Sequence, residues 1–249
     1  VYKRQGEDYG LTGRALIEGL DTALAVSGVA RARVDSLARF SGLAGRNLAG
    51  AAGLDVTGSA SPLTGAFDVE ATLIGTDVAV AQAELDRLLR GSSRIALSAA
   101  RTETGTVLRD LSVVAQSLTA QASGTISNTQ SDLAAKVDFA DLSVLGGGYR
   151  GAFLGDVRFI GAAADGRVTL TGKARDLAIG QAEADRLLRG QTALSADLSL
   201  AGGRMVLNSA LVENPQLRVA ADGAAEGAAR RINLNARLAD LALLLPDFP

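Results

Sequence analysis

Hydrophobic and polar residues alternate with a period of two along most of this chain. The segments in which every second residue is apolar are 95–97, 118–120, 133–139, 194–200, 217–221 and 232–238. This period, with one apolar face, is typical of a half-buried antiparallel β-strand. The pattern therefore predicts an all-β protein made mostly of antiparallel strands. Its parity is ambiguous at 107–114 and 205–212, so no face is assigned there.

Turn-forming residues separate the predicted strands at short intervals. The clearest groups are Ala164-Asp165-Gly166, Gly202-Gly203, Asn214-Pro215 and Asp222-Gly223. Such spacing is found in β-sandwiches, β-barrels and β-solenoids.

One long segment of the chain is repeated. The ten residues from Gln82 to Gly91 recur, with one substitution, from Gln181 to Gly190, at an offset of 99 residues (82 to 181). The offset holds without a gap from Asp77, which matches Asp176, to Leu145, which matches Leu244. A fainter copy lies upstream, where Ala32 to Asp35 resembles Ala135 to Asp138 at an offset of 103 (32 to 135).

The repeats predict the domain organisation. We expect a partial first repeat at 11–61, a second repeat at 62–160 and a truncated third repeat at 161–249, which together form one continuous β body. Residues 1–10 match nothing downstream and are interpreted as a non-repeat scar or fragment end.

One segment in each repeat has a helical pattern. In 181–189 the acidic residues come first and the arginines last, which suits the helix dipole, and Gly190 stands at the expected C-terminal cap. Ala184, Leu187 and Leu188 form an apolar face. We therefore predict a two-turn helix here and at 82–90, docked on the sheet because so short a helix is marginal alone. It is either a cap on one rim of a groove or a simple packing element.

The composition suits an open sheet better than a compact core. The chain is 47% hydrophobic but only 4% aromatic, with 29 Gly and no Trp. Large rings normally contribute much of a core's buried area. Small apolar residues at inward positions would leave space that a sandwich core has to fill. The small residues at these positions are Ala99, Ala120, Ala135, Ala196 and Ala236.

Residue types limit the chemistry. The chain has no Cys and no His, so the usual zinc, copper and haem ligands and the common nucleophilic dyads and triads are missing. Acidic pairs such as Asp138 and Asp141 are interpreted as a solvated strand face. Gly146-Gly147-Gly148 is interpreted as a flexible bend between units rather than a phosphate loop. We expect no enzymatic activity, no metal and no cofactor.

Charge and hydropathy limit the partners. The net charge is −2, and acidic and basic residues are interspersed along the chain. No cluster of basic residues could neutralise a nucleic-acid backbone, so nucleic-acid binding is not expected. No apolar run approaches the length of a membrane span, and the most hydrophobic stretch, 241–245, has only five residues. No signal peptide is visible, and the chain is interpreted as an internal fragment of a longer protein.

The repeat unit resembles the TamB family within the wider AsmA-like group of periplasmic bridge proteins. The likeness rests on 176–190, 194–198, 215–223 and 238–249, and it covers most of the chain from about residue 11 onward. It implies an elongated, curled, mostly antiparallel sheet, an open trough (or "β-taco") of repeats about 100 residues long. It also implies a periplasmic location, with an inner-membrane anchor outside this chain, and partnership with a TamA-like outer-membrane barrel through regions outside it. Such proteins support outer-membrane protein and autotransporter assembly and move phospholipid between the two membranes.

Strand parity predicts which residues would line a lipid-binding groove. These residues are Ile95, Leu97, Leu118, Leu133, Val137, Phe139, Leu194, Ala196, Leu198, Leu217, Val219, Ile232, Leu234 and Leu238. Solvent-facing residues are expected to include Ser195, Asp197, Arg218, Asn233, Asn235 and Arg237. Phospholipid acyl chains are the expected ligand. The alternative is a structural β-repeat scaffold or chaperone-like spacer that binds unfolded strands at its edge and carries no lipid.

Overall fold

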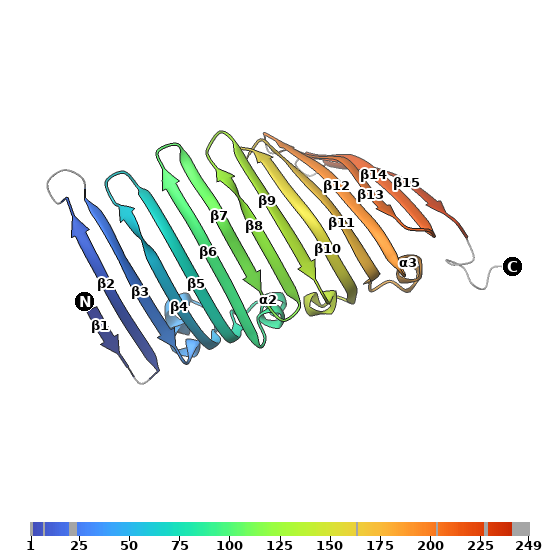
Figure 1. Ribbon diagram of the computed structural model, residues 1–249. Helices are drawn as coiled ribbons and strands as arrows, with labels where there is room; N and C mark the ends of the chain where they lie inside the picture. The colour runs from blue at the N-terminus through green and yellow to red at the C-terminus, as the bar shows by residue number, and fades with distance from the viewer. Residues whose placement is uncertain are drawn as a thin grey trace. The chain divides into compact units, whose positions relative to one another are not determined.

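The computed structural model describes residues 2–6, 8–19, 24–162, 164–202, 204–226 and 229–240. It divides the chain into two units, Val1–Ser127 and Asn128–Pro249. Each unit is an open, antiparallel β-sheet with a few short helices, which confirms the predicted fold class (Figure 1). Gly203 and the apolar stretch 241–245 lie outside the described residues.

The first unit is an up-and-down meander in which each strand pairs with the next. Its strands are β1 (Tyr2–Gln5), β2 (Tyr9–Glu18), β3 (Ala25–Val34), β4 (Ala49–Ser61), β5 (Ala66–Ala79), β6 (Ser92–Thr102), β7 (Gly105–Val114) and β8 (Leu118–Ile126). Its helices are η1 (Leu37–Phe40), α1 (Ser41–Ala44) and α2 (Ala83–Leu88). β1 pairs with Gly10–Gly13 of β2, so part of the predicted non-repeat end 1–10 belongs to the sheet.

The second unit is built in the same way. Its strands are β9 (Ser131–Phe139), β10 (Tyr149–Gly161), β11 (Gly166–Ile179), β12 (Gln191–Ala201), β13 (Arg204–Glu213), β14 (Leu217–Glu226) and β15 (Ala229–Leu238). Its helices are η2 (Leu142–Leu145) and α3 (Ala182–Leu187). In each unit the helices follow odd-numbered strands, so they lie along one end of the sheet, called here the helix rim (Figure 1).

Units and repeats divide the chain at different places. The boundary between the units lies at Ser127/Asn128, within the predicted second repeat. The predicted repeat boundaries, 61/62 and 160/161, lie at the hairpins that follow β4 and β10. The glycine run 146–148, interpreted from the sequence as a bend between repeats, lies between η2 and β10 inside the second unit.

The predicted helices are present but short. α2 and α3 have six residues each, and the C-terminal cap of α3 is Leu188 rather than Gly190. Gly190 instead pairs with Asp176: the Gly190 N–H donates to the Asp176 carboxylate at 2.9 Å, and the Asp176 N–H donates to the Gly190 carbonyl at 2.8 Å. The first unit repeats this arrangement, called here the Asp–Gly clasp, between Asp77 and Gly91 with the same two distances.

Both clasps need an unusual backbone. Asp77 and Asp176 have φ angles of 49° and 50°, a region that aspartate tolerates better than most residues because its side chain bonds locally. Asp77 lies two residues before the end of β5, and Asp176 lies three residues before the end of β11. Each clasp therefore joins the last residues of a strand to the glycine that follows the next helix.

Two β-bulges resolve the ambiguous parity. In β7, Ser98 faces Asp110 whereas Ala99 faces Leu108, so Arg109 is an extra residue. In β13 the extra residue is Asn208, one repeat later. A bulge reverses the alternation of side chains along its strand. The pattern could not be assigned to one face at 107–114 and 205–212 for this reason.

One predicted turn is wrong. Asp222-Gly223 lies within β14, where Gly223 pairs with Ile232 of β15. A side chain at Gly223 would overlap the Arg231 carbonyl oxygen. This glycine therefore permits a close approach of two strands rather than a reversal of the chain.

Candidate functional site: an uncovered apolar face

The pairing register gathers apolar side chains on one face of the second unit. Residues directly opposite in an antiparallel ladder point to the same side of the sheet. A row of such pairs runs from Leu133 through Phe159, Val168 and Leu198 to Leu207. A parallel row joins Leu194, Val212, Val219 and Ala236. We call this side the apolar face.

The first unit has an equivalent apolar face. One row joins Leu54, Leu73, Ile95 and Val113. Another row joins Ala30, Val56, Ala71, Leu97 and Leu111. Each unit therefore carries its own continuous apolar surface.

The register places all fourteen predicted lining residues on the apolar face of their own unit. Ile95, Leu97 and Leu118 belong to the first unit and the other eleven to the second. Twelve of them are half-buried, whereas Ile232 and Leu234 are 66% and 68% exposed. The predicted solvent-facing residues Asp197, Arg218 and Asn235 lie on the opposite face, as do Ser195, Asn233 and Arg237.

Within each unit, no second layer covers the apolar face in the part of the chain that the structure describes. Its buried apolar residues are only Ala99, Leu142, Ala174, Ala178, Leu187 and Leu188. An ordinary two-layer domain buries the apolar side of its sheet against another element. Here the apolar sides stay accessible along the strands.

Small residues shape a hollow in the first unit. It has a volume of about 840 Å³, within the range of small-molecule sites. Its apolar lining includes Gly13, Ala15, Val26, Gly28, Ala30, Val56, Gly58, Ala60, Phe67 and Val69. A side chain at Gly28 or Gly58 would overlap the carbonyl oxygen of Arg14 or Asp68 on the neighbouring strand. The floor of the hollow is therefore bare backbone at both glycines.

Two phenylalanines cover glycines in the second unit. A Cβ atom at Gly172 would lie 2.6 Å from the Phe153 ring, and one at Gly166 would lie 2.5 Å from the Phe159 ring. The rings lie over the backbone that these glycines expose, as aromatic side chains do next to glycines in other sheets. Strand parity did not single out Phe153 and Phe159, although both are apolar-face residues.

Helix α3 closes the apolar face at the helix rim. Leu187 and Leu188 are 5% and 7% exposed, and Thr192, an apolar-face position of β12, is 1% exposed. The Asn214 amide donates to the Leu187 carbonyl at 2.7 Å and to the Thr192 hydroxyl at 3.1 Å. These bonds join α3 to β12 and to the turn after β13, so the helix is a packing element at this rim.

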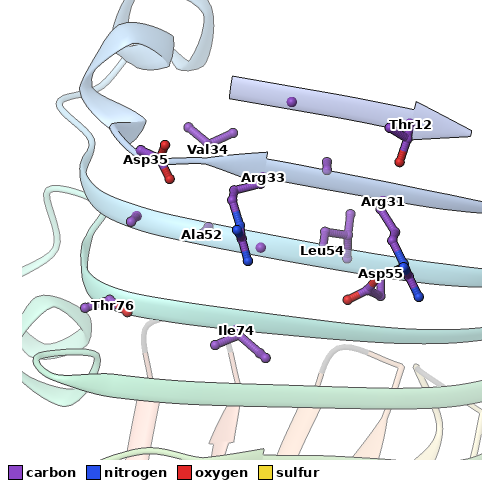
Figure 2. A pocket seen from close by; sticks show the side chains of 14 residues that line it. Thr12, Arg31, Arg33, Val34, Asp35, Ala52, Leu54, Asp55, Ile74 and Thr76 are labelled. Carbon is purple, nitrogen blue, oxygen red and sulfur yellow. Dashed lines mark ion pairs between the residues drawn. The ribbon is translucent and has the colours of Figure 1, made fainter. Parts of the chain in front are cut away.

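The opposite face carries charged residues in pairs. Arg31 and Asp55 form an ion pair of 2.8 Å beside a hollow of about 430 Å³ (Figure 2). Figure 2 shows Arg33 extending from β3 to the side away from Val34, its chain neighbour. The alternation of faces is therefore visible within two successive residues.

Ion pairs lower the pKa of several carboxyls on this polar face. Bonds from Arg167 and Asn208 lower the pKa of Asp197 to about 2. Bonds from Arg109 lower the pKa of Asp68, and bonds from Arg158 lower that of Asp132. These carboxyls stay ionised at neutral pH and keep the face hydrophilic.

The described residues contain no group of three or more Asp or Glu side chains arranged to hold a metal ion. No helix among them is long and apolar enough to cross a membrane. Comparison of the chain with protein-family models, curated proteins and solved structures finds no match.

Proposed function

We propose that the apolar faces bind the acyl chains of phospholipids. The observation that supports this is an apolar sheet face left open in each unit, with a floor of Gly and Ala and a hollow of about 840 Å³ in the first. An acyl chain gains about 0.8 kcal/mol for each methylene that it removes from water. A continuous apolar strand face offers that gain at every step along it.

The biological setting that we propose follows from the resemblance to TamB. In it the chain is a middle part of a periplasmic bridge, anchored to the inner membrane by a segment outside it. The bridge carries phospholipid between the two membranes and supports the assembly of outer-membrane proteins and autotransporters with a TamA-like barrel. The repeats of 99 residues and the open antiparallel sheets support this setting, since such units extend a sheet by addition.

The second candidate function is a scaffold or chaperone-like spacer. It would use the same exposed apolar side chains, Ile232 and Leu234 among them, to hold unfolded strands of client proteins. It predicts protein adducts where the first function predicts lipid adducts.

Adjacent residues of β15 provide the test. Leu234 is on the apolar face and Asn235 on the polar face, and both are exposed, so a photo-crosslinking amino acid is accessible at either position. In cells that make the full-length protein, we expect phospholipid adducts at Leu234 and few at Asn235. Equal lipid labelling at both positions would contradict the lipid function, and protein adducts at Leu234 alone would favour the scaffold.

A further inference from the structure

A second hollow lies at the helix rim of the second unit. It has a volume of about 610 Å³ and is formed where the loop before β10 meets the loop before α3. Its lining consists of Gly148, Arg150, Gly180, Ala182, Asp185, Arg186 and Arg189. Two of these residues are glycines and three are arginines.

Glycines allow the two loops to touch. Gly147, Gly148 and Gly180 have φ angles of 65°, 85° and 82°, which residues with a side chain rarely adopt. A Cβ atom at Gly148 would lie 2.8 Å from the Gly180 Cα atom, and one at Gly180 would lie 3.0 Å from the Gly147 carbonyl oxygen. The floor of the hollow is therefore exposed main chain.

The charge around the hollow is unbalanced. Arg158, Arg167 and Arg218 of this unit all form ion pairs, but Arg150, Arg186 and Arg189 form none with a described residue. Asp185 is the one carboxylate in the lining, and it accepts a hydrogen bond of 2.7 Å from the Ile179 N–H. The lining thus contains three arginines and a single, already bonded carboxylate.

We infer that this hollow binds a phosphate group. Guanidinium groups match phosphate oxygens in pairs and keep their charge at any physiological pH. The bare glycine backbone lets an anion approach the main chain closely. The volume exceeds that of one phosphate, which leaves room for a phosphate ester such as a lipid headgroup.

The first unit supplies a natural comparison. Gly50 and Gly151 occupy the same position in their units, since a Cβ atom at either would overlap the carbonyl oxygen of the clasp aspartate, Asp77 or Asp176. Aligned on them, Ala49 stands where the second unit has Arg150, and Asn47 where it has Gly148.

The rest of the first unit's rim is similar but incomplete. Ala81 stands where the second unit has Gly180, while Arg87 and Arg90 match Arg186 and Arg189. Arg87 lies 3.4 Å from Glu84, which neutralises part of its charge. This rim has the helix arginines but has no arginine at the position of Arg150 and lacks the glycine floor, so we expect the phosphate site in the second unit alone.

The position of the hollow suggests its natural ligand. α3 contributes Arg186 to the hollow, and its next residues, Leu187 and Leu188, are buried at the end of the apolar face. A phospholipid whose acyl chain lies on that face has its phosphate at this rim. This lipid form of the inference rests on the proposed function, whereas binding of inorganic phosphate does not.

The test uses the full 249-residue chain and two probes. Inorganic phosphate and monomeric dihexanoyl phosphatidylglycerol are titrated while the amide resonances of Gly148 and Gly180 are followed by NMR. We expect both probes to shift these resonances. Arg150→Ala combined with Arg189→Ala should weaken both titrations at least tenfold, whereas Arg90→Ala, the matched change in the first unit, should leave them within twofold.

The outcomes separate the site from its ligand. No shift of either amide with either probe would overturn the site, as would equal weakening by Arg90→Ala. Binding of inorganic phosphate without the short-chain lipid would support the anion site and overturn the lipid source. Lipid adducts at Leu234 depend on none of these arginines, so the proposed function stands or fails separately.

Discussion

The second and third repeats place different residues at the same three positions of their polar faces. In the second repeat, the Asp68 carboxylate pairs with Arg109, whose Nε donates to the Ser98 hydroxyl at 2.8 Å. The corresponding residues 99 positions later are Arg167, Asn208 and Asp197. The acid on the first strand has become a base, and the base on the third strand has become an amide.

The bonded network is kept despite this exchange. In the third repeat Arg167 pairs with Asp197 on the middle strand, and the Asn208 amide donates to the same carboxylate at 3.0 Å. Arg109 and Asn208 are both bulge residues, so the bulge directs a donor toward its neighbours in each repeat. What the repeats share is a three-strand bridge with balanced charge, not a particular residue at each position.

The two helix rims have matching backbones, but the side chains that hold α2 and α3 to the sheet differ. Leu187 and Leu188 are buried in the second unit, whereas their equivalents Leu88 and Leu89 are half-buried in the first. Asn214 ties α3 to the sheet, and Ala115 stands at that position in the first unit. The same helix sequence is therefore held more firmly in one copy.

Leucine truncation should show the largest difference between the rims. Leu188→Ala should lower the opening free energy of α3 by about 2–4 kcal/mol, because it leaves a cavity at a buried site. Leu89→Ala should cost α2 about half as much, since Leu89 is half-exposed already. Hydrogen exchange of the two helices in the full chain measures both effects. Equal losses at the two rims would contradict the difference in anchoring.

Asn214 offers a smaller and more specific change. Asn214→Ala removes two donated bonds and strips the Gln216 and Leu217 N–H groups of their acceptor, so α3 should lose about 1–2 kcal/mol. The reciprocal change, Ala115→Asn, should slow the exchange of α2 if the site can accept the amide. Unchanged exchange of α3 in Asn214→Ala would show that leucine burial alone holds the helix.

Acid should produce the smallest effect, and it tests the polar-face networks. Because the pKa of Asp197 is lowered to about 2, its contribution to stability is complete above its unfolded pKa of about 3.9 and is lost as the pH falls toward 2. Asp197→Asn should flatten the fall in stability over this window, and Asp68→Asn should do so in the second repeat. An Asp197 carboxyl that titrates near 4 by NMR would contradict the bonded geometry.

The strands and the paired helices were predictable because side-chain pattern and repetition are local properties of the sequence. The bulges could not be predicted from the sequence, because Arg109 and Asn208 are extra residues only relative to the strand that each pairs with. The Asp–Gly clasps were also missed, although Asp77 and Gly91 recur as Asp176 and Gly190 at the same separation. A search for polar residues at fixed spacing in both copies would have found them.

The apolar face could be predicted wherever alternation was strong, as at Leu194 and Leu198. Contributions from β10 and β11, such as Val157 and Leu170, were left out because frequent glycines and threonines interrupt the alternation there. The phosphate hollow depends on a contact between Gly148 and Gly180, two loops 32 residues apart (148 to 180), which no local pattern reports. In the sequence its arginines cannot be told from ordinary surface arginines, because nothing local indicates that the two loops lie together.

The two clasps also affect how such a gene can change in length. The stretches 82–91 and 181–190 are almost identical, and each is enclosed by an aspartate and a glycine that bond in the same way. Unequal recombination between them would delete or add 99 residues in frame. In a deletion, Asp77 would form its clasp with Gly190 in place of Gly91, and β5 would pair with β12 in place of the equivalent strand β6. Homologous genes should therefore vary in whole repeats, with junctions inside the helix.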